Sequence, residues 1–480
     1  MDAVDWSVGE ILWVSSWLAA CFTVPSVLFH RAGRPIAALS WLLALFALPF
    51  LSTLVWWCFG RTHLQRRSKR KREAGQLTSK GLRETRNRLD QLSGESFLAS
   101  MSALPVSQLP LALQEGVFPP TTGNNVVLLE GAKNAHQAWY ELVEQANYHL
   151  HLLFYIWCDD KVGRTLRDQL IVKAQQGVSV RVLYDAVGSF DLPNDFFEAL
   201  IHAGGKVAKF LPVTLLRAPL LNFRNHRKLL IADGHAAYTG GINVGDEYLA
   251  WQDIGITLSG AGVNQLQEVF VEDWFYCTGE ELTDADYFCR YDLHHTVSDT
   301  ATCSVIASGP DQHFNATREM VFLTITQARS RLWIATPYFI PDEALLLALR
   351  TAVYRGVDVR ILVPRDSDSR LCQRASRAYY TELLEAGVLI NEYRGMLHAK
   401  ATLIDNQGVL IGSANLDSRS FKLNFELSAV LSSESLCRQL QAWYEGLLAS
   451  SDRVFRSDLD RVGYGDRMVI SLAHLLSPLL

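Results

Sequence analysis

The sequence has no arrangement of cysteines that would bind a metal or build a disulfide framework. Its eight cysteines are scattered along 480 residues, and no two of them form a Cys-x-x-Cys pair. This argues against a zinc site and a disulfide-stapled fold, and it favours buried reduced thiols. The chain also lacks an excess of positive charge, because its formal net charge is −5. Its overall charge therefore does not favour nucleic acid as a partner.

Basic residues are also missing ahead of the first apolar run, where a secretory signal peptide would carry them. That run covers about residues 11–29 and is long enough to cross a bilayer core of ~30 Å. A second run covers about residues 36–59 after a short polar connection. We therefore predict a two-helix transmembrane hairpin over residues 1–60. A lipoprotein cleavage site at Cys21 and a pair of buried core helices are the less favoured alternatives.

A dense basic segment follows the second apolar run. Seven Lys or Arg residues lie between Arg61 and Arg72, with no acidic residue among them. Such a run beside a hydrophobic span marks the cytoplasmic side of a membrane. Because a hairpin leaves both of its ends on one side, we expect the bulk of the protein to face the cytoplasm. Residues 61–115 are predicted to be a basic linker near the lipid headgroups.

The rest of the chain reads as two similar α/β halves. Hydrophobic residues make up 49% and charged residues 20% of the sequence, which allows a large core. Each half contains a strand, a helix that ends at a glycine, and a second strand, which is a parallel α/β unit. The predicted strands are 149–157, 178–183 and 253–258 in the first half and 331–340, 357–362 and 426–431 in the second. A helix at 263–276 and a connection at 283–304 are predicted between the halves. The predicted domain bounds are 116–295 and 296–480.

One polar motif follows the α/β unit of each half. The first copy is His-x-Lys, four residues, Asp, six residues and then Gly-Gly-x-Asn, and its polar members with the second glycine are His226, Lys228, Asp233, Gly241 and Asn243. The second copy has the same spacing, at His398, Lys400, Asp405, Ser413 and Asn415. One histidine alone could be structural, but two matched copies are hard to explain in that way. We predict one site built from two similar halves.

The motif suits phosphate better than metal. In an extended segment His226 and Lys228 share a face, as do His398 and Lys400. A lysine on that face repels a metal cation, whereas it attracts a phosphate, whose oxygens the amides of the two motif asparagines can also bind. Imidazole can act as nucleophile or as general acid, because its ordinary pKa is near ~6.5.

Each catalytic imidazole needs an acceptor on its second ring nitrogen to fix its tautomer. Asp253 and Glu426 follow the two motif asparagines at similar distances and are the candidates. We expect Glu426 to orient His398. Asp233 and Asp405 lie at strand ends, which favours a local structural role for both.

The duplicated motif resembles that of the phospholipase D superfamily, and its context resembles bacterial cardiolipin synthases. The segments that carry the resemblance are 225–228, 336–342, 395–400, 412–426, the paired apolar runs and 477–480. The resemblance implies two similar phospholipase D-like lobes, each a mixed sheet flanked by helices, with a pseudo-twofold site between them. It implies no cofactor and no metal. The implied catalytic residues are His226, Lys228, Asp233, His398, Lys400 and Asp405, with Asn243, Asn415, Gly241 and Ser413 as phosphate-binding or supporting residues.

The resemblance also implies the reaction. Two phosphatidylglycerol molecules would give cardiolipin and glycerol through a phosphohistidine, in an enzyme integral to the bacterial inner membrane. Family analogy makes His226 the nucleophile and His398 the acid/base, a choice that the residues alone leave open. The alternatives are a phospholipase D-type hydrolase, another phosphatidyltransferase, or a non-catalytic scaffold that binds anionic lipid. The C-terminal run 468–476 is either an interfacial helix or packed against the domain.

Overall fold

The computed structural model of the protein describes residues 8–32, 35–57, 71, 73–78, 80–83, 85, 116–211, 223–289, 300–312 and 314–477. The chain divides into two compact units. The first comprises residues 1–69 and 214–222, and the second comprises residues 70–213 and 223–480. The two predicted lobes both lie in the second unit, whereas the predicted hairpin lies in the first.

The first apolar run forms one long helix, and the second is broken. Helix α1 spans Val8–His30, while the second run forms α2 (Pro35–Ala47) and α3 (Pro49–Val55). Pro49 stands at the start of α3, where its missing N–H is tolerated although it could not continue α2. The second apolar run is therefore helical with an interruption at Leu48, and it is not one continuous helix. Within the described residues, α1 is the one helix that is long and apolar enough to cross a membrane.

The three helices of the first unit pack on one another. The indole of Trp56 donates a hydrogen bond to Ser26 Oγ (3.1 Å), and that of Trp57 donates to Thr23 Oγ1 (3.0 Å). Val27 and Leu45 are buried in the same small apolar cluster as Trp56. The second apolar run thus returns along α1.

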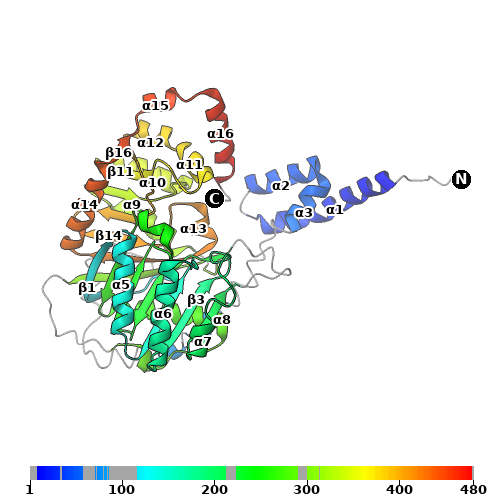
Figure 1. The fold of residues 1–480 in the computed structure, drawn as a ribbon. Helices are drawn as coiled ribbons and strands as arrows, with labels where there is room; N and C mark the ends of the chain where they lie inside the picture. The colour runs from blue at the N-terminus through cyan, green and yellow to red at the C-terminus, as the bar shows by residue number, and fades with distance from the viewer. Residues whose placement is uncertain are drawn as a thin grey trace. The chain divides into compact units, whose positions relative to one another are not determined.

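The second unit is built on one continuous mixed sheet (Figure 1). Its order is β16-β12-β11-β10-β13-β14-β15-β9-β1-β8-β7-β6-β2-β3-β4, and β5 pairs with β15 off this path. The strands of the first lobe are β1 (Thr121–Glu130), β2 (His149–Phe154), β3 (Ser179–Asp185), β4 (Lys206–Phe210), β5 (Arg224–Asn225), β6 (Leu229–Ala232), β7 (Ala236–Gly240) and β8 (Ile254–Ser259). Those of the second are β9 (Ala301–Ser308), β10 (Arg331–Ala335), β11 (Asp358–Pro364), β12 (Leu389–Tyr393), β13 (Ala401–Ile404), β14 (Gly408–Gly412), β15 (Asn424–Ser432) and β16 (Ser451–Arg453).

The sheet repeats its topology about its centre. Outward from β1, the first lobe runs β8, β7, β6, β2, β3, β4; outward from β9, the second runs β15, β14, β13, β10, β11, β12. The central strands β1 and β9 pair antiparallel. Both predicted α/β units are present, because β2 pairs parallel with β3 and β10 with β11. The predicted fold class, two similar lobes of mixed sheet, is confirmed.

Helices cover both faces of the sheet. One face packs against α8 and α14, which share a single apolar core with it. The other face packs against α5 and α6 in the first lobe and against α9, α10 and α12 in the second. The helices of this unit are α5 (Gly131–Gln145), α6 (Lys161–Gln175), α7 (Glu198–His202), α8 (Gly262–Thr278), α9 (Ala316–Gln327), α10 (Glu343–Tyr354), α11 (Arg370–Arg377), α12 (Tyr380–Ala386), α13 (Ser418–Lys422), α14 (Glu434–Leu448), α15 (Arg456–Asp460) and α16 (Tyr464–Leu475).

Several predicted bounds and states differ from the structure. The strand predicted over 331–340 ends at Ala335, before a segment whose prolines, at 337 and 341, cannot donate to a ladder. The connection predicted to run to residue 304 already includes the start of β9 at Ala301. Of the seven cysteines within the described residues, only four are buried.

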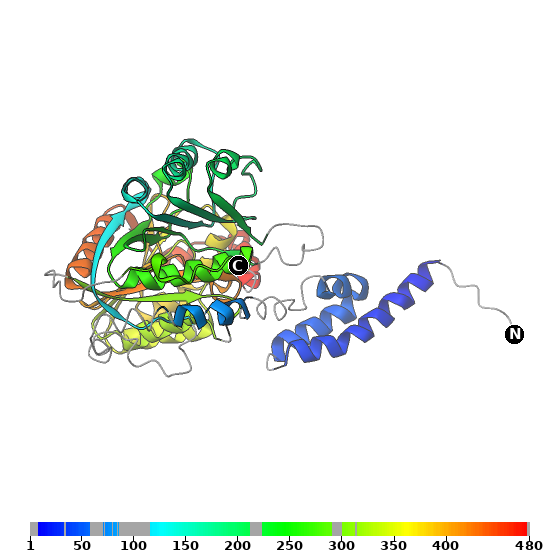
Figure 2. The same cartoon turned by 90° about the horizontal axis from the view of Figure 1, so that it is seen from below.

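Part of the predicted linker belongs to the second unit. The described residues between 71 and 85 are helical, and their buried members recur at helical spacing: Lys71, Ala74, Thr78, Leu82 and Thr85. Figure 2 shows this segment (blue) beside α8 (green). Thr85 Oγ1 donates a hydrogen bond to Thr283 O at 2.6 Å. The segment is therefore packed on the catalytic lobes over its described part, and the other predicted domain bounds stay predictions.

Candidate active site

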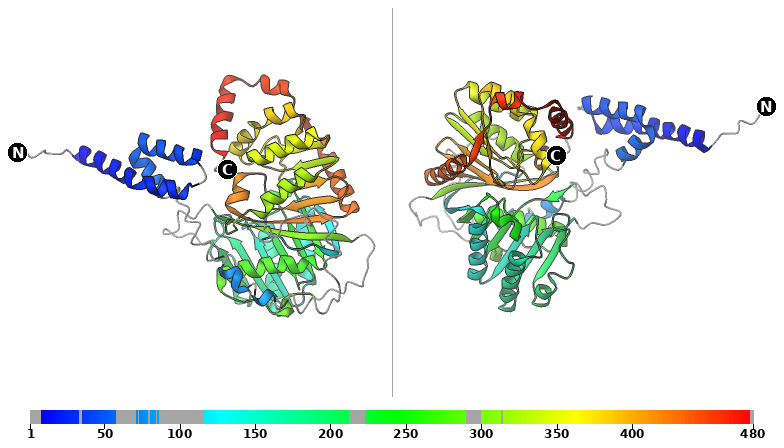
Figure 3. Two further views of the ribbon diagram at one scale, coloured as in Figure 1. Left: turned by 180° about the vertical axis from the view of Figure 1, so that it is seen from behind. Right: turned by 45° about the horizontal axis from the view of Figure 1, so that its top comes forward.

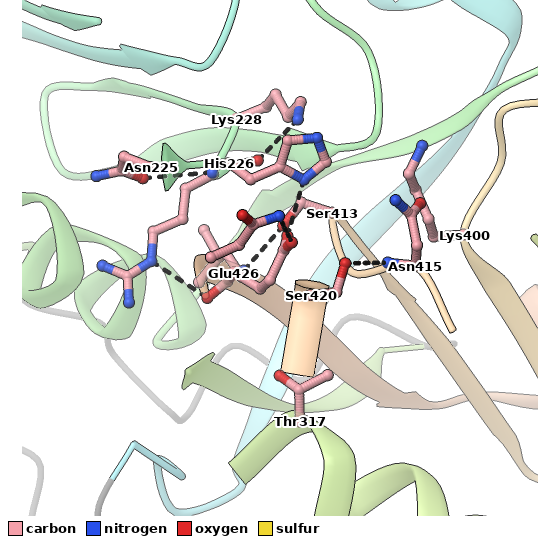
Figure 4. Close-up of polar contacts among 12 residues, drawn as sticks. Asn225, His226, Lys228, Thr317, Lys400, Ser413, Asn415, Ser420 and Glu426 are labelled. Atoms are coloured by element: carbon pink, nitrogen blue, oxygen red, sulfur yellow. Dashed lines mark hydrogen bonds and ion pairs between the residues drawn. The ribbon is translucent and has the colours of Figure 1, made fainter. Parts of the chain in front are cut away.

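The first histidine of the motif is held across the boundary between the lobes. His226 follows β5, which pairs parallel with β15 of the second lobe so that Asn225 lies opposite Phe425. The next residue on each strand is His226 on one and Glu426 on the other. Their side chains meet, with 3.0 Å between His226 Nδ1 and Glu426 Oε2 (Figure 4). The backbone register of two lobes therefore places this carboxylate on this imidazole.

The second histidine repeats the arrangement with the lobes exchanged. Leu397 of the second lobe lies opposite Gln252 of the first in a parallel bridge. The following residues are His398 and Asp253, and His398 Nδ1 lies 2.6 Å from Asp253 Oδ2. Each lobe thus supplies a histidine to its own half of the site and a carboxylate to the other half.

The predicted partner of His398 is therefore wrong. Sequence spacing placed Glu426 with His398, the histidine of the same motif copy, whereas Glu426 contacts His226 and Asp253 contacts His398. The physical reason is that β5 pairs with β15 across the lobe boundary and Gln252 bridges Leu397, which places each carboxylate beside the histidine of the other lobe. The two residues named as orienting carboxylates are nevertheless the two that contact the histidines.

Both motif lysines are buried beside their histidines. Lys228 is 0% exposed, and its Nζ donates to the backbone oxygen of His226 at 2.7 Å. Lys400 Nζ lies 2.9 Å from His398 Nε2. Burial lowers the pKa of Lys228 well below its ordinary value, and it lowers the pKa of Lys400 to about 8 although Asp253 and Glu426 oppose the change. The site therefore holds two amino groups whose charged forms a bound anion would stabilise.

Burial also keeps the two imidazoles neutral. The pKa of His226 falls to about 4, because burial and Lys228 outweigh the opposing effect of Glu426. The pKa of His398 is likewise lowered by burial and Lys400. Burial alone would raise the pKa of Glu426, but His226 and Lys228 hold it below its ordinary value. A carboxylate on Nδ1 favours the tautomer that leaves the Nε2 lone pair free to attack.

The two halves act on each other as one site. Lys400 of the second lobe lowers the pKa of His226, and Lys228 of the first lobe lowers that of His398. Figure 4 shows Lys400 and Asn415, which come from the second lobe, beside the group that contains His226 and Glu426. Among the residues that the structure describes, no group of three His, Cys, Asp or Glu side chains is placed to hold a metal ion.

The motif aspartates lie away from the histidines. Asp233 accepts backbone N–H groups of residues 147, 148 and 149 ahead of β2, each at 2.7 Å. Asp405 accepts the N–H groups of residues 329–331 ahead of β10. Both aspartates have a positive φ, 53° and 51°, which Asp tolerates in turns. Their position supports the structural role and not the catalytic one.

The remaining motif residues are the two asparagines, Ser413 and Gly241. Ser413 and Gly241 lie against the carboxylates Glu426 and Asp253. Asn243 Oδ1 accepts from Ile156 N at 3.3 Å. Asn415 Oδ1 is buried with no hydrogen-bond partner among the described residues, which leaves it able to accept a hydrogen bond from a bound hydroxyl. Ser413 Oγ donates to Glu426. A Cβ at position 241 would meet the Asp253 carboxylate at 2.4 Å, so a larger residue there would displace the partner of His398.

Sequence reasoning missed the anchor beneath the first motif. Asp273 on α8 is fully buried, and its Oδ2 accepts from Asn225 Nδ2 (2.9 Å) and Arg227 NH1 (2.7 Å). Its other oxygen lies 2.7 Å from Nζ of the buried Lys71. Arg227 in turn donates from Nε to the backbone oxygen of Glu426 at 3.2 Å. Asp273 therefore ties the residues on both sides of His226 to the helical segment at 71–85.

The charges of this anchor support one another. Burial alone would raise the pKa of Asp273, but Arg227 and Lys71 lower it to about 2. Conversely, Asp273 raises the pKa of Lys71 against the effect of burial. The available sequence signal was an Asp inside the apolar helix of residues 263–276, which no motif marks. Two aromatic contacts were also missed: the Tyr155 ring lies 4.8 Å from that of His226, and the Trp251 ring 5.1 Å from that of His398.

Two lobes of one topology, each carrying a His-x-Lys motif into a shared buried site, define a phospholipase D-like protein. A comparison with protein families agrees: the family described as "Cardiolipin synthase, PLD-like domain" matches residues 140–274 and 321–448. The chain belongs to this cardiolipin synthase family.

Full-length relatives and one solved structure fit this assignment. The chain is 36% identical to a cardiolipin synthase of Geobacillus thermodenitrificans over 99% of this chain and 96% of that protein. It is also 36% identical to cardiolipin synthase 2 of Bacillus anthracis, over 97% and 90%. The crystal structure of a phosphatidylserine synthase of Haemophilus influenzae shares the fold, with a TM-score of 0.57 at 16% identity over 74% of this chain and 95% of that one.

Proposed function

We propose that the protein is a membrane-bound phosphatidyltransferase that makes cardiolipin and glycerol from two molecules of phosphatidylglycerol. The observation that carries the proposal is the pair of crossed contacts, His226 with Glu426 and His398 with Asp253, in one buried site that also holds two lysines. Transfer of a phosphatidyl group through a phosphohistidine uses two such imidazoles, one to attack phosphorus and one to transfer a proton. Membership of the cardiolipin synthase family supplies the substrate class.

In the first step, His226 Nε2 attacks phosphorus and the bond from phosphorus to the leaving glycerol oxygen breaks. His398 gives its proton to that oxygen. The negative charge of the phosphodiester favours the protonated form of His398 and the charged forms of Lys228 and Lys400. The lysines and Asn415 stabilise the charge that develops on the phosphoryl oxygens.

In the second step, a hydroxyl of the second lipid's glycerol headgroup attacks the phosphohistidine. The nitrogen–phosphorus bond breaks, and His398 accepts the proton of the hydroxyl. Glu426 holds His226 in one orientation throughout and stabilises the positive charge of the phosphorylated imidazole. One phosphodiester is exchanged for another, so the reaction needs no energy donor.

The location is part of the proposal. The family and the candidate span α1 support association with a membrane. We propose that the N-terminal unit is a membrane anchor with more than one pass in the bacterial inner membrane and that the catalytic lobes face the cytoplasm. The seven basic residues between Arg61 and Arg72 support this orientation.

Product analysis of the purified full chain tests the proposal. Labelled phosphatidylglycerol, alone or with phosphatidylethanolamine, should yield cardiolipin and glycerol. Replacement of His226 or His398 by alanine should abolish turnover, whereas alanine at the exposed His202 should not. Free phosphatidic acid as the main product would identify a hydrolase instead, and substantial synthesis by both active-site variants would refute the mechanism.

A further inference from the structure

Helix α16 presents an apolar face that no described residue of the second unit covers. On α16, one side packs on α11: Ala473 is buried in the core of the second lobe and the His474 ring lies 5.0 Å from that of Tyr379. The opposite side holds six large apolar side chains with exposed fractions of 42–80%: Tyr464, Met468, Val469, Leu472, Leu475 and Leu476. At 100° per residue these six fall on one continuous face. Figure 3 shows α16 (red) at the edge of the second lobe.

The surroundings of this face are basic. Residues 370–377 and 456–475, which include α11, α15 and α16, contain six arginines and three aspartates. Arg374, Arg377 and Arg456 pair with Asp466, Glu392 and Glu385, so the positive charge of this surface comes from Arg370, Arg461 and Arg467. Arg370 is exposed at the start of α11. An apolar helical face with basic neighbours is the arrangement that lies in the interface of an anionic bilayer. A face meant for a second protein copy would have no need of the local positive charge.

Helix α11 connects this face to the active site. The negative charge of Asp368, two residues before α11, opposes the lowering of the Lys400 pKa. Asp368 also accepts a hydrogen bond from Tyr338 Oη at 2.7 Å. Helix α11 thus begins beside the site, and α16 packs along it. A bilayer that touched α16 would therefore contact the lobe that carries His398 and Lys400.

From these observations we propose that α16 is a docking helix that inserts its apolar face into the anionic lipid surface and so brings the site to its substrate. The inference rests on the proposed lipid substrate. The sequence left open whether residues 468–476 form an interfacial helix or pack against the domain. In this proposal one side of α16 packs on the domain and the other side docks on the lipid surface.

Photo-crosslinking tests the contact in the full chain, reconstituted in nanodiscs of phosphatidylglycerol and phosphatidylethanolamine. A diazirine amino acid at position 472 should yield lipid adducts. The same residue at position 347 on α10 should not, although Leu347 and Leu472 are 53% and 55% exposed. Adducts with water alone, or crosslinks between protein copies, at position 472 would overturn the proposal.

Introduction of negative charge into the apolar face separates docking from chemistry. The double variant Leu472→Glu, Leu475→Glu should lose about tenfold or more of its turnover of nanodisc-embedded phosphatidylglycerol, equivalent to ~1.4 kcal/mol. Its turnover of a short-chain, water-soluble phosphatidylglycerol should be unchanged, as should its thermal unfolding, since both leucines are exposed. Leu347→Glu serves as the control. Equal loss on both substrates, or no loss on either, would refute docking, whereas an absence of cardiolipin from the unmodified chain would refute the proposed function.

Discussion

Replacement of Glu426 by glutamine tests the crossed arrangement of the site. Glu426 is 0% exposed and contacts His226 Nδ1 at 3.0 Å, while Asn424 Nδ2 donates to its other oxygen at 3.0 Å. Glutamine has nearly the same shape, so the fold should persist. What disappears is the negative charge that stabilises the imidazole when it carries a phosphoryl group.

The size of the effect follows from the contact. A buried hydrogen bond to a charged group contributes roughly 1.5–3 kcal/mol, which corresponds to a rate loss of about 10- to 150-fold. The loss should fall on formation of the phosphohistidine at His226. The matched change Asp253→Asn removes the equivalent charge from His398, where the contact is 2.6 Å.

The assay isolates the step by removing the second histidine. In a His398→Ala background, the residual rate of phosphatidyl transfer to His226 is followed by rapid quenching and mass spectrometry of the adduct. Glu426→Gln should slow this rate by the same 10- to 150-fold estimate. Asp253→Asn should have no further effect, because its partner is already absent.

The opposite pattern would refute the crossed geometry. If Glu426 oriented His398, as sequence spacing alone predicts, Glu426→Gln would be silent in the His398→Ala background and Asp253→Asn would slow adduct formation. Equal effects of both changes would show that neither carboxylate acts through a single histidine.

Three further predictions concern Lys71, Asp405 and Lys400. Lys71→Met should lower the melting temperature and kcat together, by an amount equivalent to roughly 1–3 kcal/mol, because the buried Asp273 loses a partner, whereas Lys80→Met on the exposed side of the same segment should change neither. Thermal unfolding should show Asp405→Asn to be destabilised by a similar ~1–3 kcal/mol with kcat nearly unchanged, and a selective loss of kcat would contradict its structural role. Because burial lowers the pKa of Lys400 to about 8, that lysine loses its charge as the pH rises through 8, so KM should rise there. Lys400→Arg, which stays charged, should remove this dependence, and a KM that rises equally in both proteins would refute it.

Acid stability depends on the same anchor. The folded pKa of Asp273 is about 2, below its ordinary 3.8, so its ionised form stabilises the fold above about pH 4. That contribution is lost as the pH falls from about 4 toward 2. The difference corresponds to roughly 2–3 kcal/mol of unfolding free energy.

The sequence by itself determined the repeated elements and the chemical groups. Local patterns sufficed for both α/β units, because buried strands and glycine-terminated helices are recorded in hydrophobic periodicity and turn residues. The duplicated spacing also identified His226, Lys228, His398 and Lys400, since a match in two copies is improbable by chance. Pro49 is also present in the sequence and breaks the second helix, although the apolar run continues through it.

Contacts between segments distant in the chain were decided only by the tertiary structure. Glu426 is 28 residues from His398 and 200 from His226, yet it contacts the farther one. No local pattern records this, because the parallel register of β5 with β15 is set where the two lobes meet. The burial of Lys71 against Asp273 likewise depends on a contact between distant segments, here the N-terminal helical segment and α8. The sequence identified the two carboxylates, and the packing of the lobes determined which histidine each of them contacts.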